Sequence, residues 1–392
     1  MLLLKKISCL LIALSLSSFN LKEDNEITIT VKNTLKKERS NETVVLTKEF
    51  LKIKDVSALG IRDKKSGTIQ ISQTVDLDGD GLMDELLFQP TIGAKSKKEY
   101  IVFQISENQR PKTETYCYSR FVPERTDDYA WENNKVAFRT YGPRAQKMIE
   151  DNIKGGTLSS GIDAWSKRVD YPIINKWYDK MTSGKGTYHQ DNGEGLDNFH
   201  VGSSRGIGGT AVKVDSIYYI SKNFVSWKTI TTGPIRTSFI LTYADWDAAG
   251  TKITETKKIS LDYGNFLSKF EISISGTNEL STGLTLHDKK GTIGSNFKEG
   301  WLDHWETIDD SEIGTGIVVP NHKLIKIENY LTSKPDLSNH YAIIKVANHS
   351  VTYYAGFGWK KQGTFTTKEA WESYLSAFAQ KINNPLIVSL GK

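Results

Sequence analysis

The side chains best suited to catalysis gather in one stretch, residues 187–210, with the sequence TYHQDNGEGLDNFHVGSSRGIGGT. Imidazole titrates near neutral pH and a phenol can donate or accept a proton, so Tyr188 and His189 are predicted to perform acid–base catalysis. Arg205 is predicted to join them by stabilising negative charge that develops on a substrate. A segment this polar cannot bury its own backbone, so it is expected to run over the surface or to line a cavity.

The same stretch has two other interpretations. His189, Glu194, Asp197 and His200 carry donors that bind zinc or another divalent ion, so the loop could hold a metal. Alternatively, the histidines are ordinary hydrogen-bonded surface residues. Four such donors and an arginine on one short loop favour a functional site, in which we interpret Glu194 as a substrate-binding residue.

A second group of polar and aromatic side chains precedes this loop. Lys167 and Arg168 are adjacent cations, which are costly unless they face an anion such as a sugar carboxylate or a sulfate ester. We therefore predict that Lys167 takes part in catalysis and that Arg168 binds the substrate. Trp165 and Tyr178 offer flat surfaces on which a sugar could stack. The alternative is a pair of solvated cations beside a core tryptophan.

Further clusters could contribute from across a cleft. His287 follows a predicted strand, and Trp301 begins a run of aromatic, acidic and imidazole side chains, so both are predicted to bind the substrate. Another cluster contains Trp131, Glu132 and Arg139. It suits either the lining of a sugar cleft or a buried ion pair between Arg139 and Glu132, and the sequence leaves both open.

Alternating carboxylates upstream have the pattern of a cation site. Asp76, Asp78, Asp80 and Asp84 are spaced like oxygen ligands in a calcium loop, and Gly81 suits the sharp turn that such a loop needs. The twelfth position carries leucine rather than a bidentate glutamate, so the motif is no EF-hand. The pattern suits a structural calcium ion or, alternatively, a tight Asp-Gly hairpin whose acids are solvated.

The elements that must position these residues are mostly strands. Short runs rich in Ile, Val, Thr, Tyr and Phe recur, for example at residues 252–261 and 267–275, with turn residues between them. The pattern predicts an all-β protein, a large antiparallel β-sandwich with a few short helices. The clearest helix spans residues 367–381 near the C-terminus, where Thr366 and Glu369 are expected to form a capping box.

The N-terminus predicts export. Residues 1–18 combine two lysines with an apolar run and small residues, which is typical of a cleaved signal peptide that is too short to anchor the chain in a membrane. We expect a periplasmic product in which residues 19–392 form one domain. Loss of the two lysines lowers the net charge from +5 to +3 (5 − 2), which argues against nucleic-acid binding.

Longer motifs carry a resemblance to a known family. The segments DDYAWENNKVAFRTYGP, GIDAWSKRVDYPIINKWY, YHQDNGEGLDNFHVGSSRGIGG and GPIRTSFILTY occur in this order. They resemble a bacterial family of unknown-function domains found in polysaccharide-utilisation clusters, one branch of which is similar to the ulvan oligosaccharide dehydratases of marine bacteria. The resemblance covers nearly the whole mature chain. It implies a β-sandwich of the galactose-mutarotase-like kind, and removal of water from a terminal uronic acid to leave a 4,5-unsaturated uronyl end.

The chemistry of that elimination agrees with the residues chosen above. The C5 proton can be removed once cations neutralise the neighbouring carboxylate, while a base acts at C5 and an acid at the 4-hydroxyl. In glucuronate both groups lie on one face of the ring, so a single residue or the pair Tyr188 and His189 could serve both. The chemistry requires no cofactor, and the expected partner is an acidic, sulfated, uronate-containing oligosaccharide.

Other carbohydrate functions use similar residues. A polysaccharide lyase would perform the same elimination but would break a glycosidic bond. A glycoside hydrolase needs two carboxylates across that bond, for which Glu194 with Asp303 or Glu306 is the available set. A carbohydrate-binding protein without catalysis would use the tryptophans as platforms.

Overall fold

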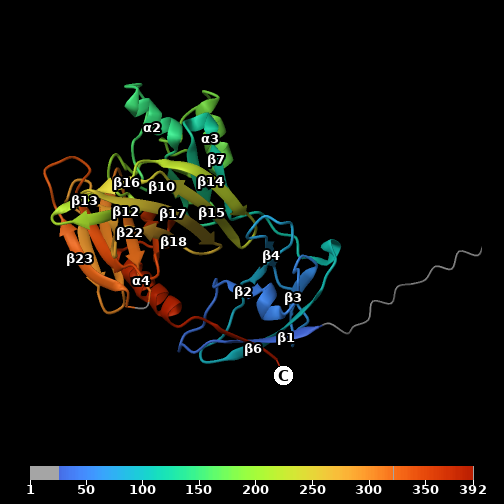
Figure 1. The fold of residues 1–392 in the computed structure, drawn as a ribbon. Helices are drawn as coiled ribbons and strands as arrows, with labels where there is room; N and C mark the ends of the chain where they lie inside the picture. Colours follow the sequence, from blue (N-terminus) through green and yellow to red (C-terminus); the bar gives the residue numbers. More distant parts are fainter. Residues whose placement is uncertain (1–25, 321, 392) are drawn as a thin grey trace, which may run out of the picture.

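The computed structural model describes residues 26–320 and 322–391, and the predicted signal peptide lies outside them. Strands dominate the described residues, in agreement with the predicted all-β class (Figure 1). The four α-helices in this part of the chain are α1 (Lys48–Leu51), α2 (Pro143–Glu150), α3 (Ile174–Thr182) and α4 (Lys368–Asn383). None of the helices within the described ranges is long and apolar enough to cross a membrane.

Two antiparallel sheets form the largest part of the molecule (Figure 1). The nine-stranded sheet contains β14 (Phe224–Thr231), β15 (Arg236–Tyr243), β16 (Trp246–Ala248), β17 (Thr251–Asp262), β18 (Leu267–Ser275), β20 (Thr292–Asn296), β21 (Trp301–Ile308), β22 (Ser311–Val318) and β25 (Ser350–Trp359). The five-stranded sheet contains β12 (Ile207–Val214), β13 (Ile217–Tyr219), β19 (Glu279–Thr285), β23 (Leu324–Tyr330) and β24 (Asn339–Lys345).

Side chains that alternate along these strands fill the space between the two sheets. In β17, Ile259 and Leu261 point into the core, whereas Lys258 lies on the outer face. Leu280 and Leu284 of β19 join the same core from the opposite sheet. The predicted β-sandwich is therefore confirmed, and the period-two pattern of the sequence explains it.

Helix α4 packs against the sandwich through Trp371 and Leu375, both fully buried. Gly316 of β22 makes room for it, because a Cβ there would lie within 2.9 Å of the Leu375 side chain. The helix occurs where predicted, but the predicted capping box with Thr366 was wrong. Thr367 is the N-cap residue, and its side chain accepts a hydrogen bond from the backbone of Ala370.

A third sheet lies beside the sandwich and is associated with α2 and α3 (Figure 1). Its strands, in sheet order, are β11 (Gly195–Leu196), β10 (Asp163–Lys167), β9 (Ala137–Thr140), β8 (Asp128–Glu132) and β7 (Tyr118–Val122). Trp131 and Phe138 point from one face of this sheet into the large core. The other face carries Ala130 and Trp165 and is covered by α3 through its buried Trp177.

The N-terminal residues form a smaller unit with its own core, which includes Val31, Leu46 and Val102 (Figure 1). One sheet contains β26 (Ile387–Leu390), β1 (Ile27–Lys32), β6 (Lys97–Gln104) and β3 (Leu59–Asp63), and the other contains β2 (Val44–Thr47), β5 (Glu85–Phe88) and β4 (Ser72–Val75). Because β26 pairs with β1, the C-terminal segment completes this unit. That one domain spans residues 19–392 stays a prediction.

Candidate active site

Strand alternation places the charged residues of the third sheet on one face. Asp128 in β8, Arg139 in β9 and Asp163 in β10 all point away from the large core, and the antiparallel register sets Arg139 opposite Asp163. All three side chains are buried. Buried charges persist only when they are paired, so these residues must satisfy one another.

Arg139 is the centre of the resulting network. Its Nε donates to Asp163 Oδ2 at 2.6 Å, and its Nη2 donates to Asp197 Oδ2 at 2.8 Å. Its Nη1 donates to the Tyr188 hydroxyl at 3.1 Å and lies 3.5 Å from Asp128 Oδ2. The arginine thus joins two strands to the loop that carries the predicted catalytic residues.

The buried surroundings of this network raise the pKa values of two of its acids. Burial, reinforced by the charge of Asp197 and opposed by Arg139, raises the pKa of Asp163 to about 7. Burial also raises the pKa of Asp128 to about 6, against the attraction of Arg139. Carboxyl groups that titrate near neutral pH beside a permanent cation are frequent at functional sites.

The hydroxyl of Tyr188 receives two charged hydrogen bonds. Arg125 Nε and Arg139 Nη1 both donate to it at 3.1 Å. Two guanidinium donors stabilise negative charge on a phenol oxygen. The sequence analysis predicted Arg205 as the cation that joins Tyr188, whereas the structure places Arg125 and Arg139 at its hydroxyl. Arg125 was missed because it lies far from the 187–210 loop in the sequence.

His189 extends into open space next to the network. Its Nδ1 lies 2.9 Å from the backbone oxygen of Asp197. A carbonyl oxygen only accepts hydrogen bonds, so Nδ1 carries the proton and Nε2 keeps its lone pair in the neutral ring. The side chain is 48% exposed, and Nε2 has no partner among the described residues. His189 is therefore a base whose free nitrogen is accessible.

A cavity of about 600 Å³ joins His189 to the buried network. This volume is typical of small-molecule and cofactor sites. The cavity is lined by Arg139, Tyr141, Ile149, Gly156, Thr157, Leu158, His189, Asp197, Asn198, Phe199, His200, Val201, Gly202 and Ser203. We call this space the His189 cavity.

Tyr141 is the functional candidate that the sequence analysis missed. It lines the His189 cavity, and its hydroxyl donates to Asp163 Oδ2 at 3.3 Å. Burial, reinforced by the charge of Asp163, raises the pKa of Tyr141 far above its ordinary value, so the phenol keeps its proton. The sequence feature that could have identified Tyr141 is its position two residues after Arg139. This spacing places both side chains on one face of an extended segment.

The loop that carries His189 is held at its far end by another pair. His200 Nε2 lies 3.2 Å from both carboxylate oxygens of Asp336. Gly202 has a φ of 50°, and a Cβ at this position would collide with the Asp336 carboxylate. Glycine therefore lets the loop pass this pair without displacing the Asp336 carboxylate.

His287 supports the same loop. Its Nδ1 lies 2.7 Å from Glu306 Oε1, and its Nε2 lies 2.6 Å from the backbone oxygen of His200. Burial alone would lower the pKa of His287, but its hydrogen bond to Glu306 and the charge of that residue outweigh burial and raise it. Both ring nitrogens therefore have internal partners. His287 does not line the His189 cavity, so its geometry gives it a role in positioning the loop rather than in binding substrate.

Comparison with known proteins identifies the family. The family model described as a domain of unknown function (DUF4861) matches residues 31–388. The chain belongs to the DUF4861 family. A relative from Formosa agariphila named "Uncharacterized protein P7" is 55% identical over 383 residues, which cover 96% of this chain and 97% of the relative. The resemblance to a family of unknown-function domains is thereby confirmed.

The fold of this DUF4861 protein also occurs among solved structures. A protein in glycosyl hydrolase family 38 from Enterococcus faecalis matches with a TM-score of 0.51 at 10% identity, covering 94% of this chain and 48% of that chain. An alpha-mannosidase from Enterococcus faecalis matches with a TM-score of 0.46 at 9% identity, covering 94% of this chain and 46% of that chain. The chain thus spans about half the length of these structures, and the first likeness shows a shared fold alone.

The DUF4861 structure corrects the predicted role of Lys167. Its side chain is 0% exposed, and its Nζ donates to Glu132 Oε2 at 2.8 Å. The backbone oxygens of Asn133 and Tyr171 accept at 3.0 Å and 2.8 Å. All three ammonium protons are used internally, so Lys167 cannot reach a substrate. Glu132 is accordingly the partner of Lys167, so the ion pair between Arg139 and Glu132, one of the two alternatives that the sequence left open, does not form.

Arg205 is likewise a core residue. Its Nη1 donates to Ser160 Oγ at 2.9 Å and to the backbone oxygen of Thr210 at 3.1 Å, while its Nη2 donates to the Ser203 backbone oxygen at 3.2 Å. The side chain is 1% exposed, and burial lowers the pKa of Arg205. Its predicted role in stabilising substrate charge is therefore not compatible with the structure.

The predicted aromatic platforms are also buried. Trp165 and Tyr178 lie in the core beneath α3 with ring centroids 4.8 Å apart, and both are 0% exposed. Trp301 is 6% exposed and donates through Nε1 to Glu299 at 2.8 Å. None of the three can stack on a sugar. Trp165 is therefore a core tryptophan, as in the alternative interpretation of its sequence cluster.

Arg168 and Glu194 lie on another side of the loop. Arg168 forms an ion pair with Asp191, and its guanidinium lies 5.2 Å from the ring centre of Trp359. Glu194 accepts a hydrogen bond from Lys176 at 2.5 Å. It lines a separate cavity of about 520 Å³, which Tyr188 also borders. Neither predicted substrate-binding residue lines the His189 cavity.

The two metal sites considered from the sequence, the acidic loop at residues 76–84 and the loop with His189 and His200, differ in how closely their ligands lie. Among the described residues, His, Cys, Asp and Glu side chains gather closely enough to hold a metal only at Asp76, Asp78 and Asp84, whose ligand atoms lie within 4.8 Å of one another. The loop with His189 and His200 forms no such group. Asp80, predicted as a fourth calcium ligand, is outside the group, and its carboxylate accepts from the backbone of Leu82.

Proposed function

We propose that this protein is a dehydratase that removes water from the non-reducing terminal uronic acid of ulvan-type oligosaccharides, leaving a 4,5-unsaturated uronyl end. The observation that carries the proposal is that His189, with its free Nε2, and Tyr141, with its retained proton, line one cavity. An elimination needs such a base and such an acid. The motif resemblance and the fold shared with a glycosyl hydrolase family 38 protein support a carbohydrate substrate.

In the proposed reaction, His189 Nε2 takes the proton from C5. The electrons of that bond form the C4–C5 double bond, while the C4–O bond breaks and Tyr141 protonates the departing hydroxyl to give water. The two residues share one cavity, and in glucuronate the two reacting groups share one face of the ring. Arg139, which also lines the cavity, stabilises negative charge on the sugar carboxylate as the proton leaves.

The buried acids give Tyr141 a route to recover its proton. The phenol is hydrogen-bonded to Asp163, whose pKa is about 7. A group that titrates near the working pH can both receive and return a proton. The Arg139 network therefore has a function in this proposal beyond holding the strands together.

A glycoside hydrolase mechanism fits the cavity less well. That mechanism needs two carboxyl groups flanking the bond. Asp197 is the one carboxylate among the lining residues, and it is held by Arg139. The predicted alternatives Glu194, Asp303 and Glu306 do not line this cavity.

The proposal is tested by His189→Asn, assayed on ulvan oligosaccharides that end in saturated glucuronate. Asparagine retains an N–H donor for the Asp197 carbonyl but lacks a base, so kcat should fall by about 10²–10⁴-fold with unchanged melting temperature. The matched control is His349→Asn at an exposed histidine on the β24–β25 turn. Turnover is followed as ultraviolet absorbance of the conjugated product together with its mass. A wild-type rate in His189→Asn would remove the residue from the mechanism.

The product distinguishes the remaining alternatives. Loss of one water without shortening of the chain supports the dehydratase. A shortened unsaturated product instead establishes a polysaccharide lyase, because the same groups then expel a sugar. Binding without any product identifies a carbohydrate-binding protein. We also propose that the protein acts in the periplasm, which the signal-peptide pattern of residues 1–18 supports.

A further inference from the structure

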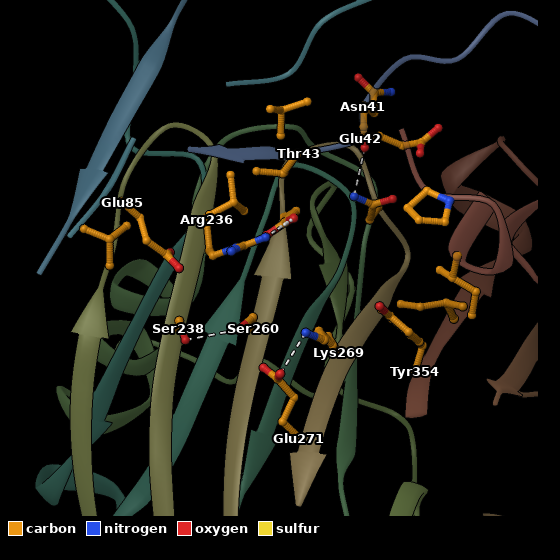
Figure 2. Close-up of a pocket in the computed structure, with 18 of the residues that line it drawn as sticks. Asn41, Glu42, Thr43, Glu85, Arg236, Ser238, Ser260, Lys269, Glu271 and Tyr354 are labelled. Carbon is orange, nitrogen blue, oxygen red and sulfur yellow. Dashed lines mark hydrogen bonds and ion pairs between the residues drawn. The ribbon is translucent and has the colours of Figure 1, made fainter. Parts of the chain in front are cut away.

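A further cavity, of about 430 Å³, lies between the N-terminal unit and the sandwich. The outer face of β15, β17 and β18 forms one wall, and residues 41–45 with Glu85 form the opposing wall (Figure 2). The C-terminal segment contributes Lys381 and Leu386. This interface cavity shares no lining residue with the His189 cavity.

The sheet face in this cavity is polar and rich in hydroxyl groups. Ser238 and Ser260 lie next to each other, with Ser260 Oγ donating to Ser238 Oγ at 3.0 Å (Figure 2). Lys258, Lys269 and Glu271 follow on the same face. A sheet face that serves only to hold two units together is expected to be apolar at its centre. The polar composition therefore indicates a surface that contacts water or a polar ligand.

Most charges in the interface cavity cancel in pairs. Arg236 binds Asp262 through two hydrogen bonds of 2.6 Å and 2.8 Å. Lys269 Nζ lies 2.8 Å from Glu271, and Lys381 Nζ lies 3.8 Å from Glu42. Glu85 and Lys258 are the other two charged residues of the lining, and they lie outside these pairs.

Glu85 and Lys258 offer complementary charged groups to the cavity. Neither side chain has a hydrogen bond or an ion pair within the described residues, although both line the cavity. Burial raises the pKa of Glu85, while Arg236 and Lys258 oppose this effect. Neither side chain is among the buried polar groups of the described residues that lack a hydrogen-bond partner, so both are open to water or to a ligand. The site therefore offers one acceptor, one donor and two hydroxyls in a space that is neutral overall.

We propose that the interface cavity binds a neutral, polyhydroxylated ligand, namely an uncharged sugar unit. Vicinal hydroxyl groups both donate and accept, so they satisfy Glu85 and Lys258 together, and Ser238 and Ser260 serve the next hydroxyl. The volume of about 430 Å³ lies in the range of small-ligand sites. A charged sugar would instead place its charge next to a like charge, that of Glu85 for an anionic sugar or that of Lys258 for a cationic sugar. The site contacts both units, so its ligand should stabilise the whole chain.

The test uses saturation-transfer NMR with cellobiose, xylobiose and L-rhamnose as neutral probes and glucuronate as the charged probe. The protein carries His189→Asn, so that no turnover interferes and failure of the proposed catalysis does not affect the result. In this background we compare Glu85→Gln, Lys258→Met and a control, Glu99→Gln, whose carboxylate forms a surface ion pair with Lys64. Melting temperatures confirm that each variant is folded.

At least one neutral probe should bind, and its affinity should fall about tenfold or more in Glu85→Gln and in Lys258→Met while Glu99→Gln retains it. Absence of binding by every neutral probe would overturn the proposal. Binding that neither Glu85→Gln nor Lys258→Met weakens would overturn it as well. Preferential binding of glucuronate that is lost in Lys258→Met would contradict the neutral ligand class.

Discussion

Two buried ion-pair systems occupy one face of the third sheet, and they differ in what covers them. Lys167 and Glu132 are both 0% exposed, and backbone groups around the pair take up their remaining hydrogen bonds. Arg139 is as tightly bonded to Asp163 and Asp197, but a cavity reaches it. The same chemistry is therefore structural at one site and accessible at the other.

The coverings explain this difference. The N-terminal end of α3 closes over Glu132, whose Oε1 accepts from the backbone nitrogens of Ile173 and Ile174 at 2.9 Å. Arg139 is covered instead by the polar loop of residues 197–203, which leaves the His189 cavity open. Whether a buried charge is accessible to a substrate thus depends on the segment that covers it. The type of residue alone does not determine its role.

Lys167→Met should have the largest effect. It leaves Glu132 as a buried carboxylate without its cation, which typically lowers the free energy of unfolding by about 3–5 kcal/mol. Urea denaturation measures the change. Lys176→Met, at a lysine whose side chain is 63% exposed, is the control and should stay close to the wild type. Equal effects of both substitutions would contradict the distinction between enclosed and exposed pairs.

Tyr141→Phe should lower kcat by about 10²-fold or more, because it removes the proton donor, and should cost only about 1 kcal/mol of stability. Tyr178→Phe is the matched control, since Tyr178 also donates to a buried acid, Asp128, at 3.1 Å but does not line the His189 cavity. Kinetics and thermal melting of both variants separate the two roles. Similar kcat values in the two variants would show that Tyr141 has no catalytic role beyond that of a buried tyrosine such as Tyr178.

Asp163→Asn should change how stability depends on pH. Asp163 has an ordinary pKa of 3.8 in the unfolded chain and a pKa of about 7 in the folded protein, so folding takes up a proton between these values. This contribution is complete below pH 3.8 and is lost as pH rises through about 7. Asparagine stays neutral, so it should flatten the fall in unfolding free energy between about pH 4 and about pH 7. The same substitution at exposed Asp215 should leave the slope unchanged.

The sequence was sufficient for the fold because strand alternation is a local signal. The alternation at Phe270, Ile272 and Ile274 predicted a half-buried strand, and all three side chains are in the core. Helix α4 was found for the same reason, from its apolar stripe. Its cap was displaced by one residue, since Thr366 and Thr367 are both suitable N-cap residues and helix boundaries are uncertain by a residue or two.

The site was harder to predict because burial depends on distant segments. Of the predicted polar stretch, His189 and residues 197–203 border a cavity, whereas residues 204–210 are buried and lead into β12. Lys167 and Arg205 were misjudged, since nothing near them in the sequence shows that Glu132 or Ser160 encloses them. Tyr141 was missed because a tyrosine acquires a high pKa only from its surroundings.

The acidic loop at Asp76, Asp78 and Asp84 is a third arrangement, in which one buried carboxylate, that of Asp84, lies close to the more exposed Asp76 and Asp78. Asp84 is already paired with Lys48 at 2.5 Å, and Asp76 accepts from the backbone of Gly79. A calcium ion must compete with these contacts, so we expect a Kd of about 10⁻⁴–10⁻³ M, as in extracellular modules.

At such affinity, calcium at about ten times Kd stabilises the protein by only about 1.4 kcal/mol, the smallest of the predicted effects. Thermal melting with calcium or a chelator measures it, and Asp78→Asn should abolish the response. Lys48→Met should strengthen the response, because it frees Asp84 for the ion. No shift with calcium in either the wild type or Lys48→Met would establish the solvated hairpin, whose acids the turn itself satisfies.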